Sequence, residues 1–289
     1  MNRRQFGGTL AALAAPWPWA WAQNSLANPA EDWAAIERRA EARLGVAVLD
    51  TATGALDGHR LDERFAMCST FKWLAAALVL RRVDQGQERL DRRVRVQRSD
   101  LLSYSPVTEK RVGGAGMTVA ELCEAAVAAS DNAAANLLLA SFGGPAALTR
   151  FARTLGDDKT RLDRIEPALN ESRPGDERDT TTPRAMAHSL RTAALGDALS
   201  GASRAQLVRW LQATVTGTER LRAGLPDDWR IGHKTGTGER GSTNDVAVLW
   251  PPRRAPIVVA AYLTDSEAPF ARREAALAAV ARSVVARLA

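Results

Sequence analysis

Three short motifs in this chain combine residue types that could transfer an acyl group: Ser69-Thr70-Phe71-Lys72, Ser130-Asp131-Asn132 and Lys234-Thr235-Gly236. A serine hydroxyl is a weak nucleophile until a neighbouring group removes its proton. Ser69 and Lys72 are three residues apart, so both side chains face the same way if the segment is helical. The apolar residues that follow Lys72 predict a buried helix, and a buried lysine requires an explanation. We therefore interpret Ser69 as a nucleophile at the start of a helix, where backbone amides favour an oxyanion.

The second motif supplies a hydroxyl and an amide. Taken alone, Ser130-Asp131-Asn132 could be a turn or a helix cap, because Asp and Asn favour both. Beside two lysines, Ser130 could pass a proton to a leaving nitrogen, and the Asn132 amide could hold a substrate amide. The motif gains its meaning only from the other two.

The third motif follows a short predicted strand. Lys234 and Thr235 could bind a carboxylate there, and the absence of a side chain at Gly236 would let a flat substrate approach the strand edge. The N–H of Thr237 could supply a second donor to an oxyanion. His233 precedes Lys234 and would point the other way on a strand, so a Ser-His-Asp triad is not indicated.

A polar stretch of about twenty residues, 161–181, reads as a loop, and a loop of that length inside a compact domain is usually functional. Within it, Glu166 and Asn170 are spaced to hold one water molecule between a carboxylate and an amide, as hydrolysis of an acyl-enzyme requires. Arg164 and Asp179 bracket the two residues and predict an ion pair that pins the ends of the loop.

Composition restricts the function further. With 289 residues, 46% hydrophobic and 25% charged, the chain is an ordinary globular protein. The net charge of +6 comes from scattered arginines, which argues against nucleic-acid binding. Three histidines with no Cys or His at ligand spacing predict no metal, and no cofactor is expected. Cys68 and Cys123 both lie in apolar segments, which favours free, buried thiols.

The first 22 residues resemble a targeting segment. Arg3 and Arg4 form a twin-arginine pair before a short apolar stretch, and Ala20-Trp21-Ala22 offers a small-x-small cleavage site. The apolar stretch is too short to remain as a membrane-spanning helix. We therefore expect a twin-arginine signal peptide over 1–22, export to a bacterial periplasm and no membrane attachment after cleavage.

Hydrophobic patterning predicts strands near both ends of the chain and helices between them. The expected strands lie at Val46–Asp50, near His59, and at Ile231–Gly236, Asn244–Trp250 and Ile257–Thr264. The expected helices lie at Glu31–Leu44, Ser69–Asp84, Val119–Ala129, Ala133–Ala140, Pro145–Thr154, Pro183–Leu195, Arg204–Thr214 and Pro269–Leu288. This order predicts an α/β domain from residues 24–60 and 220–289, with an inserted all-helical domain, 61–219, that includes the loop.

With these motifs in place, the chain closely resembles the class A serine β-lactamases from about Glu31 to Leu288. The segments that carry the likeness are Ala66–Lys72, Tyr104-Ser105-Pro106-Val107, Ser130-Asp131-Asn132, Arg164–Asn170, Asp176–Thr181 and Lys234–Gly238. The resemblance implies an α+β fold in which N- and C-terminal helices flank a five-stranded antiparallel sheet. It also implies an active site between that unit and the helical domain. A monomeric periplasmic hydrolase that confers β-lactam resistance is expected.

The resemblance also implies roles for individual residues. It makes Ser69 the acylated nucleophile and Lys72 and Glu166 the proton-transfer pair, without deciding which of the two is the acylation base. Ser130 would pass the proton to the β-lactam nitrogen. The residues implied in holding substrate or placing the deacylating water are Asn132, Asn170, Lys234, Thr235, Gly236 and Thr237, with Tyr104 as an aromatic wall at the cleft mouth.

One departure concerns the arginine that some members use to bind the substrate carboxylate. Its usual strand position is Thr243 here, and Arg220 resembles the alternative that other members use, with Arg272 and Arg273 as weaker candidates. Neither of the cysteine partners that some members use for a disulfide is present. Two other functions share the first three motifs: a penicillin-binding DD-peptidase and a sensor domain that β-lactams acylate without turnover. The Glu166 and Asn170 pair favours the hydrolase.

Overall fold

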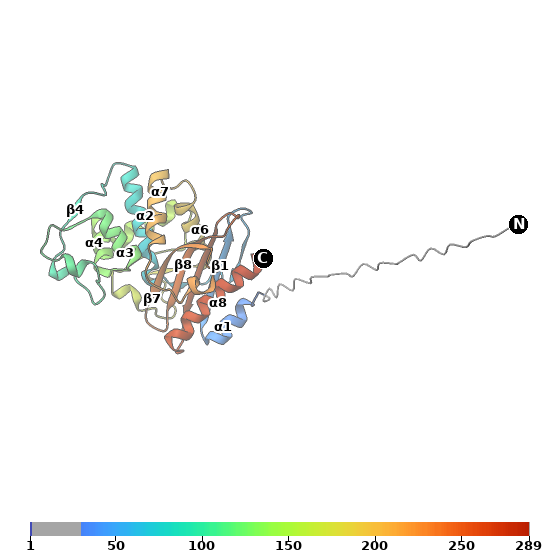
Figure 1. Ribbon diagram of the computed structural model, residues 1–289. Helices are drawn as coiled ribbons and strands as arrows, with labels where there is room; N and C mark the ends of the chain where they lie inside the picture. The colour runs from blue at the N-terminus through green and yellow to red at the C-terminus, as the bar shows by residue number, and fades with distance from the viewer. Residues whose placement is uncertain (2–29, 289) are drawn as a thin grey trace.

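The protein is built around one five-stranded antiparallel sheet in the order β2-β1-β9-β8-β7 (Figure 1). The computed structural model describes residue 1 and residues 30–288, so the predicted leader lies outside the described residues, its first residue apart. Both ends of the chain contribute to the sheet, as expected. Its strands are β1 (Arg43–Asp50), β2 (Leu56–His59), β7 (Arg230–Thr237), β8 (Thr243–Trp250) and β9 (Ile257–Thr264).

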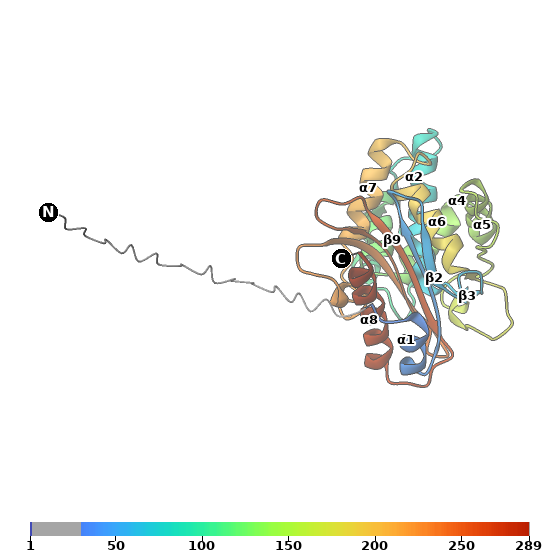
Figure 2. The same cartoon turned by 90° about the vertical axis from the view of Figure 1, so that its right-hand side faces the viewer.

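The sheet is covered on both faces. Figure 2 shows α1 (Trp33–Ala40) and α8 (Phe270–Leu288) together against one face, with the other helices beyond the opposite face. Side chains alternate along a strand, so Val46 belongs to the core shared with α1 and α8, whereas Ala47 belongs to the core shared with the other helices. Because both faces are buried, strand β9 is buried at every position. The α+β fold predicted from the sequence is confirmed.

The second layer consists of helices gathered around α2. These are α2 (Phe71–Asp84), α3 (Val119–Ala128), α4 (Asn132–Phe142), α5 (Gly144–Thr154), α6 (Pro183–Ala194) and α7 (Gly201–Gln212). Every residue of α2 from Phe71 to Ala77 is buried, since α3, α4, α5 and α7 all pack around it. None of the helices in residues 30–288 is both long and apolar enough to cross a membrane.

Helices α3 and α6 begin where the sequence reading placed them, at Val119 and Pro183, and local capping signals set both starts. The Thr118 side chain accepts a hydrogen bond from Glu121 N at the start of α3, and Glu121 bonds back to the Thr118 amide. The Thr182 side chain accepts from Ala185 N at the start of α6, with Pro183 in the first turn. Such caps satisfy amides that have no partner inside the helix.

Several elements begin or end a few residues from their expected bounds, and two differences change the description of the fold. The helix expected to reach Leu44 ends at Ala40, because Leu44 already pairs with Leu263 in the sheet. The segment expected to be all-helical also holds two short ribbons, each formed by two-residue strands that are far apart in sequence. They pair β3 (Phe65–Ala66) with β6 (Thr180–Thr181) and β4 (Arg93–Val94) with β5 (Met117–Thr118).

Replacing Ile36 in α1 with alanine tests the packing of the outer layer. Ile36 is fully buried between the sheet and α8, so the Ile36→Ala variant should lose about 2–4 kcal/mol of unfolding free energy in urea titrations. Arg38→Ala, an exposed position on the same helix, should change it by less than about 0.5 kcal/mol. Equal losses in both variants would contradict this assignment of the core.

Candidate active site

Ser69 lies in a short 3-10 helix, η1 (Cys68–Thr70), that leads directly into α2. Its hydroxyl is nearly buried and donates a hydrogen bond to Glu166 Oε1 at 3.2 Å. Its position at the N-terminal end of the α2 helix favours negative charge developing near its backbone amide. The predicted nucleophile therefore contacts the carboxylate of the predicted loop directly, although 97 residues separate them in sequence.

Lys72 is one turn further along and is completely buried. Its Nζ lies 3.0 Å from Glu166 Oε1 and donates to the Ser130 carbonyl at 2.8 Å and to Asn132 Oδ1 at 2.5 Å. Burial lowers the pKa of Lys72, while the nearby Glu166 carboxylate opposes the shift. The ammonium group therefore has a full set of three acceptors, which offsets its loss of hydration.

Lys234 is the second buried lysine, and it approaches the same residue, Ser130, from the strand side. Its Nζ donates to Ser130 Oγ and to the Thr235 carbonyl, each at 2.9 Å. Burial, and then the positive charge of Lys72, hold the pKa of Lys234 well below its usual value. Ser130 therefore lies between two lysines, with its carbonyl on Lys72 and its hydroxyl on Lys234.

The middle residue of the second motif has a structural role. Asp131 caps α4 by accepting a hydrogen bond from Ala134 N at 2.9 Å. Its other oxygen accepts from the amides of Val107 and Thr108, both at 2.9 Å. Asn132 N in turn donates to the Tyr104 carbonyl at 3.0 Å. The cap reading of Asp131 is therefore correct, and the same carboxylate attaches the Tyr104 loop to the start of α4.

The 161–181 loop presents Glu166 and Asn170 on its inner side. Asn170 Nδ2 donates to Glu166 Oε2 at 2.6 Å, while Asn170 Oδ1 is buried and has no hydrogen-bond partner among the described residues. The side chains of Glu166 and Asn170, four residues apart, can meet because Ala168–Asn170 forms a 3-10 turn. An acceptor without a partner beside a carboxylate is the environment that a bound water molecule would satisfy.

Asn136 of α4 is a residue of the site that the sequence motifs did not reveal. Its side chain accepts from Glu166 N at 3.0 Å and donates to the Glu166 carbonyl at 2.9 Å. These two bonds fix the main chain of Glu166 against the helical layer. Only its spacing could have pointed to it, since Asn132 and Asn136 are four residues apart and share one face of α4.

The ion pair expected between Arg164 and Asp179 is present. Arg164 Nε donates to the buried Asp179 carboxylate at 2.6 Å, and the amides of Asp163 and Arg164 donate to the other Asp179 oxygen. Arg164 also pairs with Glu171 at 2.7 Å. One buried carboxylate therefore joins the start of the loop to its end.

Strand β7 forms the opposite wall of the site and is an edge strand of the sheet. Thr235 Oγ1 lies 2.7 Å from Thr216 Oγ1. A Cβ on Gly236 would approach the Met67 carbonyl to 2.8 Å, so this glycine lets the strand pack closely on the nucleophile segment. That close packing is a requirement the sequence reading, which considered only substrate access, did not foresee.

Arg220 reaches the same strand from outside. Its guanidinium is almost fully buried and donates to the Gly236 carbonyl at 3.0 Å, the Asn244 carbonyl at 2.8 Å and Thr237 Oγ1 at 2.8 Å. Glu274, which the sequence reading also missed, accepts from Arg220 Nε at 3.2 Å.

The weaker arginine candidates differ in position. Arg272 pairs with Glu41 on the surface. Arg273 donates a long hydrogen bond of 3.4 Å to Thr243 Oγ1, and its guanidinium lies over the Phe270 ring. His233 is bonded to Asp245 at 2.9 Å on the face of β7 away from Lys234, as expected.

These groups enclose a cleft of about 500 Å³ between β7 and the helical layer. Tyr104, 48% exposed, stands at its edge. The lining residues are Ser69, Tyr104, Ser130, Asn132, Asn170, Thr216, Gly217, Arg220, Thr235, Gly236, Thr237, Phe270 and Glu274. Lys72, Lys234 and Glu166 lie just behind this lining, bonded to Ser69 and Ser130. The structure thus brings together every site residue expected from the sequence.

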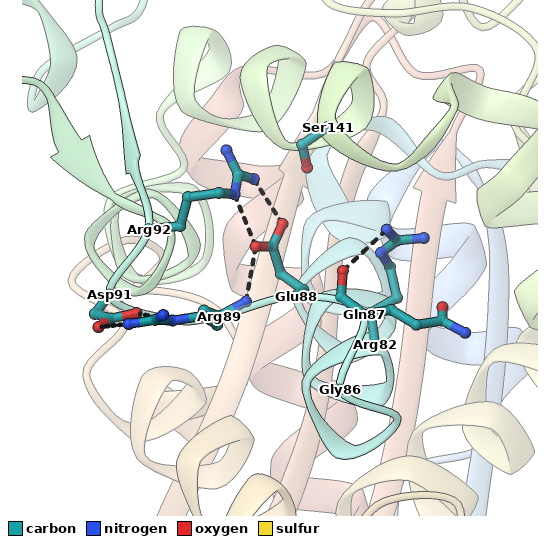
Figure 3. Close-up of a pocket in the computed structure, with 8 residues that line it drawn as sticks. All are labelled: Arg82, Gly86, Gln87, Glu88, Arg89, Asp91, Arg92 and Ser141. Atoms are coloured by element: carbon teal, nitrogen blue, oxygen red, sulfur yellow. Dashed lines mark hydrogen bonds and ion pairs between the residues drawn. The ribbon is translucent and has the colours of Figure 1, made fainter.

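A larger pocket, of about 690 Å³, lies where α2 ends (Figure 3). Four of its charged side chains are already paired: Arg92 donates twice to Glu88, at 2.8 and 2.6 Å, and Arg89 pairs with Asp91. The fifth, Arg82, donates to the Gln87 carbonyl at 3.4 Å. Its hydroxyl, on Ser141, donates to a carbonyl of its own helix. The pocket offers no nucleophile with a base beside it, so we do not assign the chemistry to it.

Residues that bind metals are not grouped in the part of the chain that the structure describes: no set of three His, Cys, Asp or Glu side chains is placed to hold an ion there. Cys68 and Cys123 are buried and unbridged, as predicted. Burial raises the pKa of the Cys68 thiol to about 12. The buried groups of the cleft are the ones that a serine acyl-transfer enzyme requires: a serine, two lysines and a carboxylate, from Ser69, Lys72, Lys234 and Glu166.

Comparison with known proteins identifies the family. Residues 28–288 match the β-lactamase enzyme family. The chain is 51% identical to β-lactamase CTX-M-8 of Citrobacter amalonaticus over 251 residues, 87% of this chain and 86% of the relative. It is 51% identical to β-lactamase Toho-1 of Escherichia coli over 250 residues, 86% of each chain.

Solved structures agree. The class A β-lactamase of the last common ancestor of Gram-negative bacteria (GNCA4) superposes with a TM-score of 0.88 at 66% identity, over 89% of this chain and 98% of that one. The chain therefore belongs to the class A β-lactamases, as the motifs indicated.

Removing the carboxylate of Asp179 tests how the loop is fixed. Asp179→Ala leaves two amides and the Nε of a largely buried guanidinium without their acceptor, so we expect a loss of about 3 kcal/mol in unfolding free energy. Trypsin should also cut the 161–181 loop faster. Asp176→Ala, which removes the more exposed loop pair with Arg178, should cost less than about 1 kcal/mol. Similar losses in the two variants would contradict this view of the loop.

Proposed function

We propose that this chain, a β-lactam hydrolase by family, opens the ring of penicillins and cephalosporins through an ester on Ser69. The observation that carries the proposal is the convergence of three groups on one carboxylate: Glu166 contacts Ser69 Oγ, Lys72 Nζ and Asn170 Nδ2. One carboxylate can therefore serve the step that forms the ester and the step that hydrolyses it.

In acylation, Ser69 Oγ attacks the lactam carbonyl and loses its proton to Glu166, whose Oε1 already accepts it at 3.2 Å. Lys72 stabilises the carboxylate and completes the proton-transfer pair. The carbonyl oxygen becomes negative in the transition state, and the amides of Ser69 and Thr237 are the donors that we assign to it. Cleavage of the C–N bond then leaves an ester on Ser69.

The ring nitrogen needs a proton as it leaves. Ser130 Oγ is the donor that we assign, because Lys234 holds it at 2.9 Å and Lys72 holds the carbonyl of the same residue. Two buried cations beside a hydroxyl favour loss of its proton toward a basic nitrogen. Ser130 must regain a proton afterwards. We assign Lys72, which contacts both Glu166 and the carbonyl of Ser130, to pass on toward Ser130 the proton that Ser69 gave to Glu166.

The substrate carboxylate is assigned to the strand side of the cleft, where Lys234 and Thr235 are close to the guanidinium of Arg220. Asn132 is assigned to the side-chain amide of the substrate, and Tyr104 to the wall at the mouth. Support comes from the cleft lining, which contains Arg220, Thr235, Asn132 and Tyr104. Glu274, paired with Arg220, keeps that arginine in the wall of the cleft.

Deacylation requires a water molecule next to the ester. We assign its binding to Glu166 and to Asn170, whose buried Oδ1 is otherwise unpaired among residues 30–288. Glu166 removes a proton from the water, the hydroxide attacks the ester carbonyl, and Ser69 regains its proton. A DD-peptidase or a sensor that stays acylated by β-lactams is less consistent with a water site built beside the ester, so neither alternative is favoured.

We also propose an export leader, a monomeric state and two structural units for this chain. A twin-arginine leader over residues 1–22, supported by Arg3 and Arg4, would export the protein to the periplasm. A monomer is supported by the small number of large apolar side chains exposed in the described part of the chain. The division into 24–60 with 220–289, and 61–219, is supported by the two cores on opposite faces of the sheet.

Removing the carboxylate of Glu166 should separate the two steps. In Glu166→Ala the ester should still form, but more slowly, with Lys72 as the remaining base of the proton-transfer pair. The ester should then persist, so intact mass spectrometry after mixing with a chromogenic cephalosporin should show a stable adduct. Ser69→Ala should show no adduct and lose at least about a thousandfold in turnover. Glu177→Gln changes an exposed carboxylate of the same loop and should behave as the parent. Rapid release of the adduct from Glu166→Ala would remove Glu166 from deacylation.

The pKa of Lys234 gives a pH prediction. If its charge holds substrate, kcat/KM should fall as pH rises through this pKa, which burial places below that of an ordinary lysine. An arginine keeps its charge throughout, so Lys234→Arg should move the alkaline limb of kcat/KM to higher pH. Lys159→Arg, at an exposed lysine, should leave the limb unchanged. Coincident limbs for the parent and Lys234→Arg, measured from pH 6 to 10, would rule out Lys234 as the group that titrates.

A further inference from the structure

A chain of hydroxyl groups joins the end of the sheet to the main chain of Asn170. Ser242 Oγ donates to Ser172 Oγ at 2.9 Å, and Ser172 Oγ donates to the Asn170 carbonyl at 3.3 Å. Thr264 Oγ1, at the end of β9, lies 3.1 Å from Ser242 Oγ. None of these three hydroxyls lines the cleft, so the chain approaches the site from behind.

The direction of the chain follows from counting protons. Each hydroxyl has a single proton, and those of Ser242 and Ser172 are used toward Asn170. Thr264 must therefore donate to Ser242. By the same reasoning the Cys68 thiol, 3.9 Å from Ser172 Oγ, donates to that oxygen. The burial that keeps Cys68 protonated is consistent with this role.

Backbone contacts make the connection tight. Glu239 N donates to the same Asn170 carbonyl at 2.9 Å, and Ser242 bonds to Gly238 and Glu239 across the β7–β8 turn. A Cβ on Gly238 would come within 2.9 Å of the Asn170 carbonyl, so the turn packs directly on the loop. Ser172 has φ 51°, in the left-handed region that a serine rarely adopts. A strained backbone persists only where its surroundings enforce it.

The hydroxyl chain ends at the carbonyl oxygen of Asn170, a residue of the proposed water site. The Asn170 carbonyl belongs to the residue whose side chain donates to Glu166 Oε2 at 2.6 Å and has a buried, unpaired Oδ1. The bonds from Asn136 hold Glu166 from the helical side, but they do not reach Asn170. Apart from a contact to Pro167 within its own turn, Asn170 is held by the β7–β8 turn and by the hydroxyl chain.

We propose that Ser172 and Ser242 are positioning residues for deacylation: through this hydroxyl chain they fix Asn170, and with it the water that Glu166 activates. The proposal rests on the roles proposed above for Glu166 and Asn170. Acylation does not use Asn170, so it should proceed normally when the chain is broken. Neither serine touches the substrate, and Thr264 supports them from the sheet.

The test measures the two rate constants separately, by quenched flow and intact mass, with a cephalosporin that gives a burst in the parent. In Ser242→Ala, deacylation should slow about five- to tenfold while acylation changes less than about twofold, the range expected for losing one hydrogen bond. Because only the second step slows, kcat and KM should fall together and kcat/KM should remain constant. Simple loss of folded protein would lower kcat and leave KM unchanged.

Further variants test the hydroxyl chain itself. Ser172→Ala should have the same effect, and Ser172→Ala/Ser242→Ala should be no slower than Ser172→Ala alone, because both act through one connection. Thr264→Val removes the supporting hydroxyl and should slow deacylation, whereas Thr264→Ser keeps it and should match the parent. Ser283→Ala removes a buried hydroxyl that donates to a carbonyl in the outer layer, so it should lower stability without changing the ratio of the two rate constants.

The outcomes separate the two proposals. If Glu166→Ala accumulates the ester but Ser242→Ala deacylates like the parent, the hydroxyl chain does not position Asn170 and this inference is wrong. Additive losses in Ser172→Ala and Ser242→Ala would also overturn it. If Glu166→Ala releases its ester quickly, the proposed deacylation mechanism fails first, whatever the serine variants do.

Discussion

The rest of the structure depends on one buried ion pair, between Lys72 and Glu166 at 3.0 Å. Moving an ammonium and a carboxylate out of water costs several kcal/mol for each ion, and it is offset only when every remaining donor and acceptor is satisfied. The carbonyl of Ser130 and the side chain of Asn132 accept the other hydrogen bonds of the Lys72 ammonium. Ser69 and Asn170 donate hydrogen bonds to the two oxygens of the Glu166 carboxylate. The groups that balance this charge pair are the same groups that the reaction needs.

Glu166 can take part only because its loop is fixed from three sides. Asp179 closes the loop at its ends, Asn136 fixes the main chain of Glu166 to α4, and the β7–β8 turn contacts the carbonyl of Asn170. A loop of this length would otherwise be mobile, because flexible surface segments make few buried contacts. Its stability is therefore part of the chemistry, since proton transfer needs heavy atoms within hydrogen-bond reach.

The second buried lysine, Lys234, adds positive charge to the strand side of the cleft. Lys234 is buried near Lys72, so each cation raises the cost of ionising the other. Arg220 adds a third cation at the same strand, bonded to the carbonyls of Gly236 in β7 and Asn244 in β8. Positive charge is thus concentrated along β7, where an anionic substrate would gain most, while the Glu166 carboxylate faces the nucleophile.

The sequence by itself determined the features that depend on local pattern: the buried strands β8 and β9, the capped starts of α3 and α6, and the motif residues around Ser69, Ser130 and Lys234. It also indicated the family, because those motifs occur in one order. Only the tertiary structure decided which distant groups meet. Asn136 at Glu166, Glu274 at Arg220 and Ser242 at Ser172 are contacts over 30, 54 and 70 residues. Side-chain periodicity reports which face is buried, but not what is packed against it, and so it could not reveal them.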